Sequence, residues 1–102
     1  MTDDSARKSR AVVVFLGHGV EPSPSRYPER LVAEFGEEQG LDLGMYVRAV
    51  LGELFAVPTD WRVEPDLWKR TDQIVAVVAA NHPELNDEAL AALRSYYSFQ
   101  SK

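Results

Sequence analysis

The feature that most constrains the fold is a long stretch of helical periodicity over residues 41–57. Its apolar residues recur at spacings of four, three and four, and they are Leu43, Val47, Val50 and Leu54. This spacing places them on one face of an α-helix, whereas a strand would alternate every second residue. Pro58 follows at once and ends the helix, because proline cannot continue its hydrogen bonds. The rest of the chain must provide elements that cover this apolar face.

Two further helices are predicted, and a proline opens each of them. Pro28 suits the first helical position, where its missing N–H is not needed, and Gly36 ends that helix. Pro65 opens a later helix with Asp66 in its first turn, where a carboxylate favours the positive end of the helix dipole. That helix ends near Asn81, because the next proline lies two residues beyond it.

The closing stretch of the chain predicts a capped terminal helix. Asn86 is a preferred N-cap residue. Leu85 precedes it and Leu90 is the fourth helical residue, which is the spacing of a hydrophobic staple. Taken together, the helices predict one core. Its members include Leu31, Phe35, Val47, Val50, Leu54, Leu67, Ile74, Val78, Leu90 and Leu93.

The segment ahead of these helices is less constrained. Residues 1–10 are polar and have no periodicity, so we expect a loose tail. Val12–Leu16 is rich in valine, which favours a strand, but no second strand is available to pair with it. We therefore favour a helix that ends at Gly17, and keep an α+β fold with a short strand at 12–16 as the alternative. Residues 17–27 are rich in proline, glycine and serine and form a connector.

The expected fold is thus a single all-α domain over residues 1–102. It is a small bundle of four main helices with an irregular or helical N-terminal segment. A chain of this length is close to the commonest size of one domain.

The composition excludes several kinds of site. The chain has no cysteine, which rules out disulfides and thiolate metal sites and fits a reducing cytoplasm. Its longest apolar run, residues 11–16, is far shorter than the roughly 20 residues that a membrane helix needs. The net charge of −5 repels phosphate. We therefore expect a cytoplasmic protein that binds neither nucleic acid nor a membrane.

Most of the net negative charge is concentrated in one part of the sequence. Residues 29–56 hold six acidic residues and two arginines, which leaves −4 of the total of −5 in this region. Such a surface attracts a basic protein partner, although an acidic face also keeps a small protein soluble. The predicted partner-binding carboxylates are Glu34, Glu37, Glu38 and Asp42.

Aromatic residues supply a second set of candidates. Tryptophan and tyrosine dominate the energetic hot spots of interfaces, and we predict that Trp61, Trp68 and Tyr96 contact the partner. Core packing is the alternative for such residues in a small helical domain. In another alternative, Tyr96 and Tyr97 bury against a second copy, and the chain is an oligomerising structural or regulatory module.

Signals for catalysis are weak. The chain has no Gly-x-Ser-x-Gly elbow, and its two histidines do not have the spacing of a metal site. His18 stands between two glycines and fits an exposed turn, whereas His82 precedes a proline and fits a helix end. We predict no catalytic residue, no metal and no cofactor. A small hydrolase that uses His18 or His82 is the second alternative.

The residues around the last helix carry a family resemblance. The stretch from His82 to Ala89 reads HPELNDEA, and it is followed by Leu93 and by YSF at 97–99. This stretch resembles the C-terminus of small bacterial immunity proteins of contact-dependent growth inhibition systems, whose chains often end in HPELSDEA…L…YTFD. Gln100 stands where that pattern has an acidic residue. Elsewhere, SRYPERLVAEFG and VRAVLGELFAV are similar to small uncharacterised actinobacterial proteins.

The resemblance implies a helical protein without catalytic activity that binds and neutralises one toxin domain in the producing cell. Such immunity proteins are commonly acidic and oppose basic nuclease toxins, which fits the charge of residues 29–56. It implies no particular toxin-contacting residue, because these surfaces diverge from pair to pair. The expected function is therefore that of a partner-binding protein whose partner is a basic protein, and the resemblance implies that this partner is a toxin domain.

Overall fold

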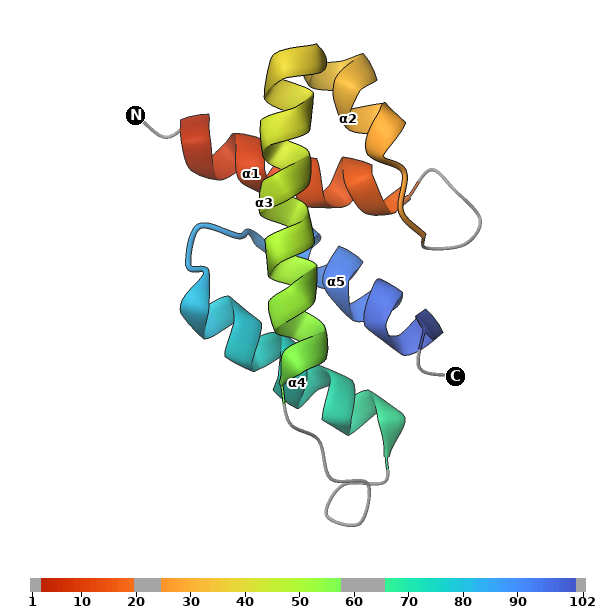
Figure 1. Cartoon of the computed structure of the whole chain (residues 1–102). Coiled ribbons are helices and arrows are strands. Elements are labelled where there is room, and N and C mark those ends of the chain that lie inside the picture. Colours follow the sequence, from red (N-terminus) through yellow and green to blue (C-terminus); the bar gives the residue numbers. More distant parts are fainter. Residues whose placement is uncertain (1–2, 20–24, 58–65, 101–102) are drawn as a thin grey trace.

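The computed structural model describes residues 3–19, 25–57 and 66–100, and these residues form five helices (Figure 1). The helices are α1 (Asp3–Leu16), α2 (Pro28–Phe35), α3 (Glu37–Ala56), α4 (Leu67–Asn81) and α5 (Asp87–Gln100). No strand occurs among the described residues, so the all-α class is confirmed. The α+β alternative is wrong, because residues 12–16 continue α1 instead of forming a strand.

The N-terminal helix α1 is a full member of the bundle, so the expected four main helices become five in the described chain. The expectation of a loose tail over residues 1–10 is wrong from Asp3 onward. Ser9 is only 1% exposed and extends the buried face of Val12 and Leu16 by one turn. A polar residue at a buried position hid this turn from the sequence pattern.

The end of α1 determines where the connector starts. Gly17 has a φ of 69°, in the left-handed region, and the amide of His18 bonds to the carbonyl of Val13 at 3.1 Å. This is the Schellman arrangement that ends helices, so the predicted stop at Gly17 is confirmed. At the far end of the connector, the amide of Tyr27 bonds to the carbonyl of Phe15 at 2.7 Å. α2 therefore begins beside the end of α1.

A sharp joint at Gly36 separates α2 from α3. Its φ of 89° is accessible mainly to glycine, and it ends α2 as predicted. α3 then begins at Glu37, earlier than the predicted range of 41–57, because the glycines in its first half do not interrupt it. A Cβ atom on Gly40 would lie 2.8 Å from the Cα of Val32. This glycine therefore allows α2 and α3 to pack closely.

Side-chain caps begin both α4 and α5. Asp66 accepts hydrogen bonds from two backbone amides, at 2.9 and 3.2 Å, so it is the N-cap of α4 and not part of its first turn as predicted. Pro65, which was predicted to open this helix, lies outside the described residues. α4 ends at Asn81 as predicted. Asn86 accepts the amide of Ala89 at 2.9 Å, which confirms the predicted cap of α5.

α3 is the axis around which the other helices are arranged (Figure 1). α1 and α2 pack towards its start, α4 lies towards its end, and α5 packs against both α1 and α4. One core contains side chains from all five helices. The buried members of the predicted core are Leu31, Val47, Val50, Leu54, Ile74, Val78 and Leu93. The members that are only half-buried are Phe35, Leu67 and Leu90.

Candidate functional site

The first turns of α3 carry a group of exposed carboxylates. Glu37, Glu38 and Asp42 are all exposed. Leu41 and Met45 lie among them, with 59% and 68% of their surfaces exposed. The sequence pattern did not single out these two residues, because the main apolar stripe of the helix is on its buried side. We call these five residues the α3 face. An apolar centre with a polar rim is the usual anatomy of a protein interface.

Glu34, the fourth predicted carboxylate, is engaged elsewhere. Its side chain pairs with Arg10 of α1, with the Nε of the arginine 2.8 Å and its Nη2 3.3 Å from the carboxylate oxygens. The two helices are joined by this exposed ion pair. The charge of Glu34 is therefore balanced within the molecule, and the residue is not part of the α3 face.

Tyr96, one of the predicted partner contacts, is a buried residue in this structure. It is 5% exposed, and its hydroxyl accepts a hydrogen bond from the Nε of Arg26 at 2.9 Å. Tyr97 is buried as well, and the ring of Phe55 contacts both tyrosines. Both tyrosines belong to the core, so they do not form the exposed surface that the alternative of burial against a second copy requires.

The two tryptophans are not brought to the α3 face. Trp68 is 59% exposed, but it lies in the first turn of α4, near the opposite end of α3 (Figure 1). The 20 residues of α3 span about 30 Å, which separates the two surfaces. Trp61 lies outside the described residues. The exposed side chains that accompany the carboxylates are therefore aliphatic and not aromatic.

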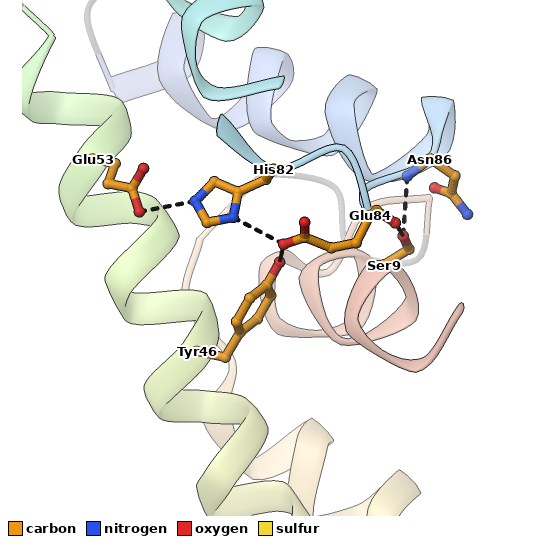
Figure 2. A network of polar contacts seen from close by, with 6 residues as sticks. All are labelled: Ser9, Tyr46, Glu53, His82, Glu84 and Asn86. Atoms are coloured by element: carbon orange, nitrogen blue, oxygen red, sulfur yellow. Dashed lines mark hydrogen bonds and ion pairs between the residues drawn. The ribbon is translucent and has the colours of Figure 1, made fainter. Parts of the chain in front are cut away.

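A polar junction surrounds His82, at the end of α4 (Figure 2). Its Nδ1 lies 2.8 Å from a carboxylate oxygen of Glu84, and its Nε2 lies 2.8 Å from one of Glu53 in α3. The hydroxyl of Tyr46, also in α3, donates to the same oxygen of Glu84 at 2.5 Å. The ammonium of Lys8, in α1, lies over the ring of Tyr46. This junction connects α3 to the turn that precedes α5.

Ser9 fastens the same turn to α1. Its hydroxyl donates to the backbone carbonyl of Glu84 at 3.1 Å and accepts the amide of Asn86 at 3.0 Å (Figure 2). The stretch from His82 to Asn86 thus contacts two helices that lie far from it in sequence. Each polar residue of that stretch has a role in holding the fold together.

The charges of the junction shift the pKa values of its residues. Burial alone would lower the pKa of His82, but its hydrogen bonds with Glu53 and Glu84 outweigh burial, and the pKa is raised from 6.5. For Glu84, burial acts to raise the pKa, and the hydrogen bond from Tyr46 together with His82 lowers it below 4.5. Both shifts favour a charged imidazolium between two carboxylates.

The junction engages both ring nitrogens of His82, because each of them contacts a carboxylate oxygen. These contacts tie the end of α4 to α3 and to the turn before α5. Among the described residues, no three histidine, aspartate or glutamate side chains form a group able to hold a metal ion.

His18 borders a separate, open cavity of about 270 Å³ between α1 and α2. The cavity is lined by Arg10, Val13, Val14, Gly17, His18, Arg30, Ala33 and Glu34. None of these lining residues carries a hydroxyl or thiol, and the one carboxylate among them, Glu34, is paired with Arg10.

None of the described helices combines the length and the apolar content needed to cross a bilayer. In comparisons with known proteins, no family model, no curated protein and no solved structure matches the chain.

Proposed function

We propose that this protein is a non-catalytic binding protein that docks onto a basic protein surface through the α3 face. The observation that carries the proposal is the exposure of Leu41 and Met45 among the carboxylates of Glu37, Glu38 and Asp42. Burying apolar side chains against a partner supplies affinity. The surrounding carboxylates speed the encounter with positive charge and disfavour acidic partners.

The resemblance of the closing stretch suggests a class of partner. We extend the proposal to an immunity protein that neutralises one basic toxin domain in the cytoplasm of the producing cell. The resemblance rests on the stretch that begins at His82, and this stretch ties the helices together. On this proposal it supports the shape of the protein, whereas the α3 face contacts the toxin.

The test is the rate of association with a toxin domain encoded beside this gene, measured at several salt concentrations. Changing both Glu37 and Glu38 to lysine is expected to slow association by about tenfold or more at low ionic strength. The effect should shrink at high salt, because exposed charges are screened beyond about 10 Å at 0.1 M. Met45→Ser should mainly speed dissociation, because most affinity changes within one interface are in the off-rate.

A matched control separates the α3 face from net charge alone. Glu29 and Asp87 are also exposed carboxylates in first helical turns, so changing both to lysine alters the net charge and the helix ends equally. If both double variants slow association to the same extent, the α3 face is not the docking site. If the toxin domain does not bind at all, the immunity assignment is wrong.

A further inference from the structure

A narrow apolar stripe continues from the α3 face along the exposed side of the helix. Leu41, Met45, Ala49 and Gly52 are all exposed, at successive spacings of four, four and three residues. At 100° per residue, these positions lie within about 80° of arc. The stripe is therefore straight, one helix face wide, and made of two large side chains followed by two small ones.

Gly52 has no neighbour inside the described molecule that accounts for it. A Cβ atom on this residue would meet nothing within 4 Å. Gly40, by contrast, lies directly against α2 and cannot carry a side chain without a clash. Glycine lowers the stability of a helix interior compared with alanine. A bare surface at Gly52 does permit the close approach of another backbone from outside.

The shape of the stripe fits a second helix. Spacings of three and four residues are those by which helices interdigitate, and small residues allow the two axes to approach. A strongly curved partner would leave one end of a straight stripe uncovered, and a smooth partner would leave the space over the two small residues unfilled. Large side chains of the partner would fill the space over Ala49 and Gly52, while Leu41 and Met45 insert between side chains of the partner.

Charge selects among possible helices. Glu38 and Asp42 flank the large apolar residues, and Glu37 precedes them in the first turn. A second acidic helix would be repelled at this end. Building on the function proposed above, we infer that the partner presents an amphipathic helix, apolar on one face and basic along its edge, which lies along α3 from Leu41 to Gly52.

The experiment uses the full chain and a synthetic peptide of about 21 residues, with leucine and alanine on one helical face and lysine on the other. A second peptide has the same composition in an order that destroys the apolar face. We expect the first peptide to bind at least about tenfold more tightly by fluorescence anisotropy, because only it places apolar area on the stripe. The amide NMR signals that shift should be those of residues 41–52.

Gly52→Leu should weaken binding of the first peptide by about tenfold or more, because it fills the space that the peptide helix needs. The matched control is Ala76→Leu, at an exposed position of α4, which should leave binding unchanged. Circular dichroism confirms that both variants are folded.

Equal affinity for the two peptides, no binding of either, or unchanged affinity in Gly52→Leu would each overturn the helical partner. These outcomes leave the proposed function standing if a basic toxin domain still binds in a manner that depends on Glu37 and Glu38. The experiment can also contradict the proposed function while the peptide still binds. Peptide binding that is insensitive to the lysine variant of these two residues would contradict the acidic docking surface itself.

Discussion

The Nε2 atom of His82 lies 2.8 Å from a carboxylate oxygen of Glu53, and this contact joins the end of α4 to the second half of α3. The other ring nitrogen makes an equally short contact with Glu84. A neutral imidazole has only one N–H, so it can donate to only one of the two carboxylates. The junction is therefore complete only when the ring is protonated.

Protein stability should depend on pH through His82. Its pKa in the folded state is raised above 6.5, so its stabilising contribution is complete below that value and is lost as pH rises through the folded-state pKa. Urea unfolding of the protein and of His82→Gln should show a larger difference in unfolding free energy at about pH 6 than at about pH 9. An equal difference at both values would contradict the charged junction.

Protein stability should also depend on pH through Glu84, at the acidic end of the range. Its pKa is lowered below 4.5, so its stabilising effect is present above 4.5 and is lost as pH falls through the folded-state pKa. Glu84→Gln should therefore be less stable than the parent protein near pH 6, and the difference should narrow towards about pH 3. Urea midpoints measured across this range provide the check, and a constant difference would refute the assignment.

Ser9→Ala should destabilise the protein by about 1–3 kcal/mol, because it removes both hydrogen bonds to the turn before α5 in a buried setting. Ser5→Ala is the control in the same helix. Ser5 is exposed, so this change should stay within about 0.5 kcal/mol. Chemical unfolding at constant pH measures both, and similar values for the two variants would show that Ser9 is not a fastening point.

Two of the three glycines in α3, Gly40 and Gly52, should respond in opposite directions to alanine. Gly52→Ala is expected to stabilise the protein by about 0.5–1 kcal/mol, because its Cβ enters open space and alanine favours a helix. Gly40→Ala should destabilise it, because the Cβ would lie 2.8 Å from the backbone of Val32. Thermal unfolding measures the change in Tm of both variants. A rise in Tm for Gly40→Ala would contradict the tight α2–α3 packing.

Tyr96 and Trp68 were both predicted to bind the partner. Replacing each with alanine should show, by the loss of stability, which of them belongs to the core and which to the surface. Tyr96→Ala should cost about 3–5 kcal/mol of stability, because it leaves a large cavity in the core. Trp68→Ala should change the free energy of unfolding by less than about 0.5 kcal/mol, because the side chain is mostly exposed. A stable Tyr96→Ala variant would return this residue to the list of surface candidates.

The sequence predicted those parts of the fold that depend on local signals. The stop at Gly17, the joint at Gly36 and the cap at Asn86 are set by backbone geometry within a few residues, and each is confirmed. The first turns of α1 depend on a contact across 75 residues, between Ser9 and the carbonyl of Glu84. No local pattern contains that contact, so this part was missed.

In the candidate site, too, local patterns predicted some residues, whereas others depend on contacts between helices. The exposure of Asp42 follows from the helical repeat, which places it off the buried face. Glu37 and Glu38 precede the predicted helix, and they join this surface because α3 begins earlier than the repeat does. The ion pair between Glu34 and Arg10 depends on how α1 packs against α2, and the spacing of residues along one helix cannot predict it. Tyr96 is buried because α5 packs against both α1 and α4, and the spacing of residues within α5 does not contain these contacts between helices.

The packing of α1 against α5 has a consequence during synthesis on the ribosome. The valine-rich face of α1 emerges early, but one of the helices that cover it comes from residues 87–100. A nascent chain that has not yet released these residues carries an incomplete core and an adhesive apolar surface. Folding of this domain must therefore finish after release of α5 from the ribosome, and until then the apolar face of α1 is exposed to chaperones that bind unfinished chains.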